Sequence, residues 1–209
     1  MDSTMKIANC IRAAAEDVGL PKPTVAQAKN IIGLGLNECM EILFPSAQKS
    51  QRQSMVERYK FHFVTGDQTE QALFDGVCEG LKRLEQHGAM LAVATGKSRV
   101  GLDRAFAITG IKGHFVTSRC ADETRTKPHP QMLLEILDFT AIDANKSIMV
   151  GDTSYDMELA ANAGMHGLGV SYGAHGADTL IESGAFTVQH SVNEMLNWLL
   201  DGRIEKAYV

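Results

Sequence analysis

The stretch IMVGDTSYDMELAANAGM, residues 148–165, decides the fold. It opens with a short apolar run, Ile148–Val150, of the kind that forms a buried strand. Gly151 and Asp152 follow, and a helical pattern then continues to Gly164, a residue type that often ends helices. Asp152 is therefore expected where a strand is followed by a helix. In open α/β sheets, ligands bind at this carboxyl end of the strands.

A second carboxylate lies within reach of the first. Asp156 follows Asp152 by four residues, about one helical turn, so both side chains can face one point. Two carboxylates at one strand end favour a hard divalent cation, most simply Mg²⁺. The alternative is purely structural, because residues 153–156 fit a capping box in which Asp156 caps its own helix. This segment alone does not decide between a magnesium site and a helix cap.

Composition and charge narrow the class of protein. The chain has 209 residues, of which 44% are hydrophobic and 22% charged, with a net charge of −5. Nucleic-acid binding needs a basic patch, which this acidic balance disfavours. No apolar run reaches the roughly 18 residues of a membrane span, and residues 1–10 lack the apolar centre of a signal peptide. The four cysteines form no CxxC pair, so zinc is disfavoured and reduced thiols are expected. We expect a cytoplasmic protein without nucleic-acid or membrane partners.

The pattern of apolar residues changes along the chain. Residues 4–66 show helical spacing and no strand pattern, which predicts an all-helical domain. In residues 67–209, short apolar runs alternate with helical segments, which indicates a parallel sheet covered by helices on both faces. We therefore predict an α/β core with a Rossmann-like parallel sheet, joined to the helical domain by a hinge near residues 66–68. The expected strands are residues 90–94, 115–117, 148–150, 168–170 and 186–188.

A second group of polar residues follows the strand expected at residues 90–94. Thr95, Gly96 and Lys97 lead from it into a helix. The Thr95 hydroxyl and the next two backbone amides could hold an anion such as phosphate near the helix N-terminus. The alternative is an ordinary helix cap. The letters GKS resemble part of a P-loop, but Leu91 stands where that motif needs glycine, so we reject it.

Lys127 lies between a loop and an expected helix start, in the sequence TRTKPHPQML. Pro128 disfavours helical backbone at Lys127, so the lysine can aim its ammonium inward as a point charge. Most lysines are simply solvated, and that alternative stays open at this point. The neighbouring His129 is interpreted as a capping or packing residue rather than a base.

Thr95, Lys127, Asp152 and Asp156 fall in chain order on successive strand ends or the loops beside them. This joint pattern resembles the haloacid dehalogenase superfamily, and in particular its phosphoglycolate-phosphatase-like branch, subfamily IA. VATGKS looks like the second motif of that family, the Lys-Pro pair like its third, and GDTSYD like its fourth. Residues 4–66 look like its helical cap, so the resemblance covers essentially the whole chain.

The resemblance implies Mg²⁺-dependent hydrolysis of a small phosphomonoester through an aspartyl-phosphate. Thr95 and Gly96 would bind the phosphoryl group, and Lys127 would bind it too and offset its charge. Asp152 would hold the magnesium ion, and Asp156 would support the coordination shell of the metal. The implied partner is a small phosphorylated metabolite such as phosphoglycolate, because a cap that closes over a site excludes bulky substrates.

The first motif of the family is where this sequence departs. That motif is an apolar strand followed by DxDGT, whose first aspartate is the nucleophile and whose second is the acid and base. Here Met1-Asp2-Ser3 looks like the tail of the motif, and no other DxD replaces it. We expect the first core strand to be absent and the chain as written to be inactive. Either the start was chosen at an internal methionine, which we favour, or catalysis has been lost.

The absent strand would lie between the strands that end at Thr95 and Gly151. Its loss would leave two inner sheet edges unpaired, which invites a homodimer or strand exchange with another chain. The alternative to an enzyme is a non-catalytic phosphometabolite-binding or regulatory protein that kept Thr95, Lys127 and Mg²⁺. A receiver domain also surrounds a phospho-aspartate with acids, threonine and lysine, but it gives no reason for a helical domain.

Overall fold

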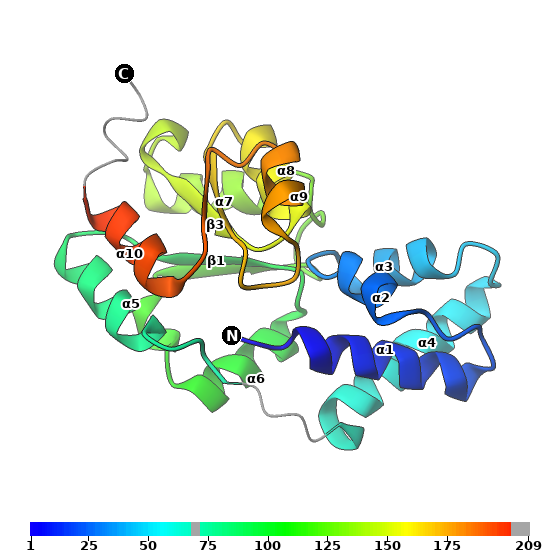
Figure 1. Cartoon of the computed structure of the whole chain (residues 1–209). Coiled ribbons are helices and arrows are strands. Elements are labelled where there is room, and N and C mark those ends of the chain that lie inside the picture. The colour runs from blue at the N-terminus through cyan, green and yellow to red at the C-terminus, as the bar shows by residue number, and fades with distance from the viewer. Residues whose placement is uncertain (68–71, 202–209) are drawn as a thin grey trace.

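The computed structural model describes residues 1–67 and 72–201 (Figure 1). The chain begins with helices and then alternates strands with helices. The first part contains α1 (Thr4–Val18), α2 (Val25–Asn30), α3 (Leu36–Leu43), α4 (Lys49–Phe61) and the π-helical turn η1 (His62–Gly66). The second part contains α5 (Val77–Gln86), β1 (Ala92–Thr95), α6 (Arg99–Thr109), η2 (Lys112–His114), β2 (Thr117–Cys120), α7 (Gln131–Thr140), η3 (Ala144–Lys146), β3 (Ile148–Gly151), α8 (Ser154–Asn162), β4 (His166–Val170), α9 (Ala177–Glu182), β5 (Thr187–Gln189) and α10 (Val192–Leu200).

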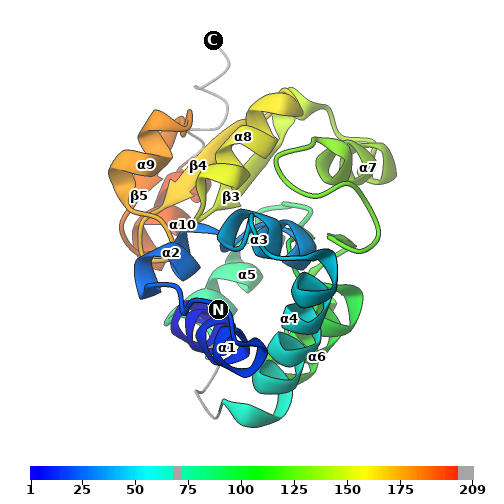
Figure 2. The same cartoon turned by 90° about the vertical axis from the view of Figure 1, so that its right-hand side faces the viewer.

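Helices α1 to α4 surround a hydrophobic core of their own, and Figure 2 views this part end on. Local sequence sets their ends. Gly19 closes α1 in the left-handed conformation, and Thr24 caps α2 through a reciprocal capping box with Gln27. The expectation of helices without strands over residues 4–66 is confirmed. The domain boundary stays a prediction, and Gln68 of the expected hinge lies outside the described residues. Buried members of the core include Ile11, Ala14, Ile31, Met40 and Met55.

The strands are all parallel but form two sheets. β1 pairs with β2, and β3, β4 and β5 form a second sheet in that order. Within residues 1–67 and 72–201, no strand pairs with the second edge of β1 or with the free edge of β3. The strand expected at residues 115–117 lies instead at residues 117–120, because Phe115 packs into the core from the preceding loop. The absence of a first core strand stays a prediction.

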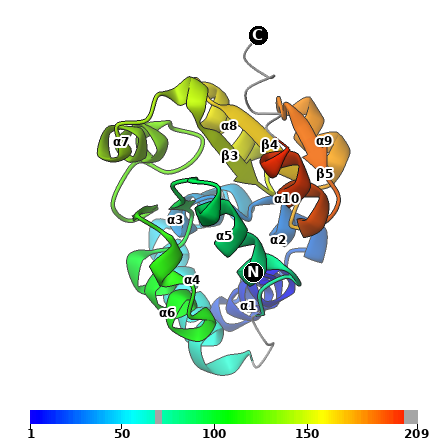
Figure 3. The same cartoon turned by 90° about the vertical axis from the view of Figure 1, so that its left-hand side faces the viewer.

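Helices cover both faces of the sheets. Leu133 of α7 and Leu159 of α8 pack on one face, against residues of both β1 and β3. On the opposite face, α6 packs on β1 through a cluster that includes Val93, and Trp198 of α10 packs near Ile148 of β3. Figure 3 shows α5 beside α10 on this second face. None of the described helices is long and apolar enough to cross a membrane.

The inner edges of the two sheets are incompletely covered. Strands in the middle of a parallel sheet are normally buried on both faces. Here every residue of β1 is only half-buried, and Val150 of β3 is 36% exposed. A cavity of about 290 Å³ lies beside β1. Its apolar lining includes Leu73, Val77, Leu81, Val93, Leu102 and Phe106.

Candidate active site

The site begins where β3 ends. Asp152 directly follows Gly151, the last residue of β3, and α8 starts at Ser154. Glycine is required at position 151 because a Cβ there would overlap the side chain of Asp156. The first turn of α8 can therefore fold back onto the strand end. This turn places Asp156 next to the end of β3, as its spacing from Asp152 suggests.

Both carboxylate oxygens of Asp156 are already engaged. Lys127 Nζ donates to Oδ1 at 2.5 Å, and both side chains are 5% exposed. The Thr153 amide and hydroxyl donate to Oδ2 at 3.1 Å and 2.8 Å. The capping-box interpretation of Asp156 is therefore confirmed, and the same carboxylate also holds the buried lysine. Lys127 is not a solvated surface lysine. The role of Asp156 in supporting a metal stays a prediction.

Asp152 has one carboxylate oxygen that is available to a metal ion. The Ala174 amide donates to its Oδ2 at 2.8 Å, whereas among the described residues nothing donates to Oδ1. Burial, and next the negative charge of Asp156, raise the pKa of the Asp152 carboxyl. A cation beside Oδ1 would offset both effects. Mg²⁺ is commonly held by one or two carboxylates, with water and phosphate oxygens completing its shell. Asp152 therefore fits a magnesium ligand, although no cluster of three His, Cys, Asp or Glu ligands occurs in the described part of the chain.

Thr95 is the last residue of β1, and Gly96 follows it. The Lys97 amide donates to Thr95 Oγ1 at 3.1 Å, so the hydroxyl proton stays available for an anion. A Cβ at Gly96 would lie 2.5 Å from the carbonyl oxygen of Gly33 and 2.6 Å from that of Leu34. Glycine at position 96 is thus explained by a close backbone approach. Its predicted role in phosphate binding stays a prediction.

The approaching segment is residues 31–35, called here the glycine loop, which joins α2 to α3. It lies beside the end of β1 in Figure 1. Gly33 also lies against Thr153, where a Cβ would come 2.8 Å from the hydroxyl oxygen. Thr126, the neighbour of Lys127, hydrogen-bonds to Glu38 of α3. The three segments that carry Thr95, Lys127 and Asp152 therefore meet beneath the glycine loop and the start of α3.

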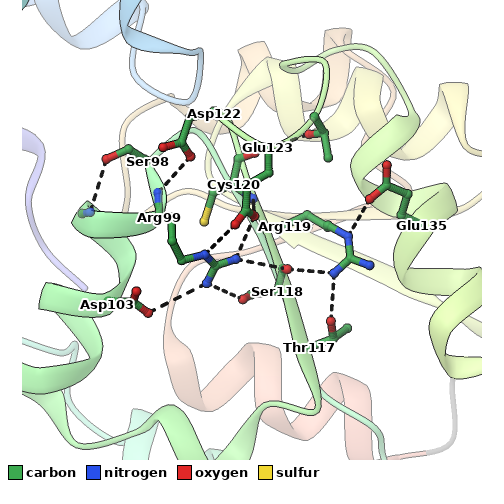
Figure 4. A network of polar contacts seen from close by, with 12 residues as sticks. Ser98, Arg99, Asp103, Thr117, Ser118, Arg119, Cys120, Asp122, Glu123 and Glu135 are labelled. Atoms are coloured by element: carbon green, nitrogen blue, oxygen red, sulfur yellow. Dashed lines mark hydrogen bonds and ion pairs between the residues drawn. The ribbon is translucent and has the colours of Figure 1, made fainter.

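Two arginines brace the loop that carries Lys127 (Figure 4). Arg99 donates to Glu123 through Nε at 2.7 Å and through Nη2 at 2.8 Å, a bidentate pair. This pair lowers the pKa of Glu123 to about 2. Arg119 of β2 donates to Glu135 of α7 at 2.6 Å. Arg99 therefore holds the loop between β2 and α7 at Glu123, and the Arg119–Glu135 pair joins the two elements that flank the loop.

Sequence reasoning missed the loop of residues 171–176. Its Ala174 amide binds the Asp152 carboxylate, and His175 Nδ1 accepts the Ser154 amide at 3.0 Å. The loop follows β4 directly, so the rule that ligands bind at the carboxyl ends of strands could have singled it out. His129 accepts the Gln131 amide at 3.2 Å, which confirms its interpretation as a capping residue.

Comparison with known proteins identifies the family. The model of the haloacid dehalogenase-like hydrolases matches residues 1–170. The chain belongs to this family. IndB of Dickeya dadantii (strain 3937), named as a probable phosphatase, is 31% identical over 184 residues, which cover 86% of this chain and 80% of IndB. The phosphoglycolate phosphatase of Xanthomonas campestris pv. campestris (strain 8004) is 27% identical over 182 residues, which cover 83% and 79% of the two chains.

Solved structures share the fold. A hydrolase from Pseudomonas syringae matches with a TM-score of 0.82 over 95% of this chain and 92% of its own, at 19% identity. The predicted fold class, a helix-covered parallel α/β core of the Rossmann-like type, is confirmed, and so is the family resemblance. The chain is of phosphatase lineage.

Proposed function

We propose that this chain carries the substrate and metal machinery of a Mg²⁺-dependent phosphohydrolase that acts on small phosphomonoesters such as phosphoglycolate. One observation carries the proposal. Thr95, the buried pair of Lys127 and Asp156, and Asp152 lie on segments that meet beneath the glycine loop. We place the protein in the cytoplasm, with a small phosphorylated metabolite as its partner.

Each residue has a distinct task. Asp152 would hold the magnesium ion through Oδ1, and the bound ion would stabilise negative charge on the phosphoryl oxygens. Thr95 would donate its free hydroxyl proton to a phosphoryl oxygen. Lys127 would keep one positive charge beside the phosphoryl group while Asp156 holds its ammonium in place. The glycine loop would exclude water from the site.

The nucleophile would come from an apolar strand that is not among the strands of residues 1–67 and 72–201. The open edges of β1 and β3 and the cavity of about 290 Å³ support this part of the proposal. A parallel strand of about five residues would pair with both edges and bury its apolar side chains in the cavity. Its carboxyl end would lie near Thr95, which lines the cavity together with Met1. An aspartate at that end would face the bound phosphoryl group.

The decisive experiment adds this strand ahead of Met1. An extension that encodes an apolar strand and DxDGTL should give Mg²⁺-dependent hydrolysis of 2-phosphoglycolate or of an aryl phosphate. The matched control carries the same extension with its first aspartate changed to asparagine, which keeps the strand and removes the nucleophile. The unextended chain should not turn over these substrates. Robust turnover by the unextended chain, lost on Asp152→Asn, would contradict the assignment of the motifs.

A non-catalytic phosphometabolite-binding or regulatory protein is the second candidate. It is favoured by the availability of Thr95 and Asp152 for an anion and a metal without a nucleophile among the described residues. Calorimetric titration with inorganic phosphate and Mg²⁺ separates the two candidates. Phosphate binding by the extended protein without any turnover supports the binder, whereas turnover supports the enzyme.

The open strand edges also bear on self-association. We propose that without an added strand two copies pair through β1 or β3, as a homodimer or by strand exchange. Light scattering over a concentration series should then show a dimer for the unextended chain and a monomer for the extended one. Monomers of both at every concentration would rule out pairing through these edges.

A further inference from the structure

We infer that His175 is a positioning residue that couples the placement of the glycine loop to the carboxylate pair Asp152 and Asp156. The metal readout used below rests on the proposed function, whereas the geometry of the bridge does not. His175 belongs to the loop after β4 and is 6% exposed. Its contacts reach both the metal-binding candidate and the helical part of the chain.

One side of His175 contacts the backbone beside the two carboxylates. Its backbone amide donates to the Asp152 carbonyl oxygen at 3.0 Å. Its ring nitrogen Nδ1 accepts the amide of Ser154 at 3.0 Å. Ser154 is the first residue of α8, and Asp156 lies in the first turn of that helix. His175 therefore fixes the start of the helix that carries Asp156.

The other side of the ring reaches the helical part. Because Nδ1 accepts a hydrogen bond, the neutral imidazole carries its proton on Nε2. Nε2 lies 3.2 Å from the Asn30 carbonyl oxygen and therefore donates to it. Asn30 ends α2 and immediately precedes the glycine loop, and a carbonyl at a helix end lacks an intrahelical partner. The hydroxyl of Tyr155 donates to the same oxygen at 3.2 Å.

These contacts make the two ends of the ring interdependent. If the glycine loop withdraws, Nε2–H loses its acceptor in a buried place, and the ring is no longer held against Ser154. If the first turn of α8 loosens, the ring loses the contact that fixes its tautomer and orientation. Two equilibria that share one residue are coupled reciprocally. Mg²⁺ at Asp152 should therefore tighten the glycine loop, and a tight loop should raise Mg²⁺ affinity.

Two substitutions separate the two ends of His175. In His175→Asn the amide oxygen takes the place of Nδ1, so Ser154 keeps its acceptor while Asn30 loses its donor. In His175→Gln the amide nitrogen takes the place of Nε2, so Asn30 keeps its donor while Ser154 loses its acceptor. Hydrogen exchange of the amides in residues 30–36 is measured with and without Mg²⁺, and Mg²⁺ is also titrated calorimetrically.

The parent protein should show slower exchange in residues 30–36 when Mg²⁺ binds. His175→Asn should raise the exchange rate without Mg²⁺ about fivefold, the effect of one hydrogen bond, and should abolish the Mg²⁺ effect. His175→Gln should keep the basal rate within about twofold but also lose the Mg²⁺ effect, because its link to Ser154 is gone. Tyr155→Phe, which removes only the parallel contact to Asn30, should raise the basal rate and keep the Mg²⁺ effect.

Retention of the full Mg²⁺ effect in both His175 variants would overturn the coupling and leave His175 as a packing residue. Equal basal exchange in the Asn and Gln variants would overturn the bridge itself. If the parent binds no Mg²⁺, the proposed metal function fails, and the basal rates of the two variants still test the bridge. Failure of the metal proposal and failure of this inference are thus distinguishable.

Discussion

Lys127 Nζ and Asp156 Oδ1 lie 2.5 Å apart in a place where both side chains are 5% exposed. A buried ion pair contributes little net stability, but removal of one partner leaves an uncompensated buried charge. The Thr153 amide and hydroxyl both donate to the second oxygen of Asp156, so both oxygens of this carboxylate accept hydrogen bonds. Loss of either partner is therefore expected to destabilise the fold, and the same pair is a candidate part of the active site.

Lys127→Met should lower the free energy of unfolding by about 3–5 kcal/mol at neutral pH. The methionine fills the space of the lysine stem but leaves the charge of Asp156 buried and unpaired. The double variant Lys127→Met/Asp156→Asn should recover most of the loss, because asparagine can still accept from Thr153 without carrying a charge. Urea unfolding of the two variants and the parent measures both effects. Additive losses in the double variant would show that the two groups do not act as a pair.

Asp152→Asn should weaken Mg²⁺ binding more than Asp156→Asn does. Of these two carboxylates, Asp152 alone has an oxygen to which no described residue donates, since both oxygens of Asp156 are engaged. Calorimetric titration of both variants in the strand-extended protein decides the matter. Equal losses would indicate direct ligation by both carboxylates, and no loss in either would leave Asp156 as a helix cap alone.

Asp152→Asn should also stabilise the metal-free protein at pH 7. The pKa of Asp152 is raised in the folded state by burial and by Asp156. A carboxyl with a raised folded pKa binds its proton more tightly when folded, so its ionisation destabilises the fold as the pH rises. The advantage of asparagine should be largest above the folded pKa and should vanish as the pH falls below the unfolded value near 4. Thermal unfolding of the variant and the parent from pH 4 to pH 8 without Mg²⁺ measures this advantage. A difference in Tm that stays the same across that range would refute the prediction.

Gly96→Ala should displace the glycine loop. The new Cβ would lie within 2.6 Å of the carbonyl oxygens of Gly33 and Leu34, so backbone must move, at a cost of about 1–3 kcal/mol. Amides of the glycine loop should exchange faster as a result. Gly113→Ala is the matched control, because a Cβ there meets open space and should change stability by less than about 0.5 kcal/mol. Equal behaviour of the two variants would mean that the loop is not held at Gly96.

The sequence predicted those parts of the fold that depend on local patterns. Asp152 could be placed because an apolar run, a glycine and a capping box follow one another within a few residues. β2 was misplaced because its residues Thr117–Cys120 are mostly polar, whereas the apolar Phe115 beside them packs from a loop against Phe106. Edge strands with half-buried residues carry no clear hydrophobic alternation, so their pattern is weak.

The contacts that close the candidate site could not be predicted in this way. The packing of Gly33 against Thr153 joins residues 120 positions apart. His175 bridges Ser154 and Asn30, and the latter lies 145 positions away. No spacing rule connects such residues. Their proximity follows from how the helical part docks on the core, which depends on the shape of both surfaces.

Leu133 and Leu159 hold β1 and β3 on a common layer of helices, although those two strands share no backbone hydrogen bonds. Thr95, the candidate phosphate-binding residue, ends a strand of one sheet. Asp152, the candidate metal ligand, directly follows a strand of the other sheet. Side-chain packing on a shared layer of helices, rather than a ladder of backbone hydrogen bonds between β1 and β3, therefore sets the spacing between these two residues. Leu159→Ala, which replaces none of the candidate site residues, would therefore change the separation between Thr95 and Asp152.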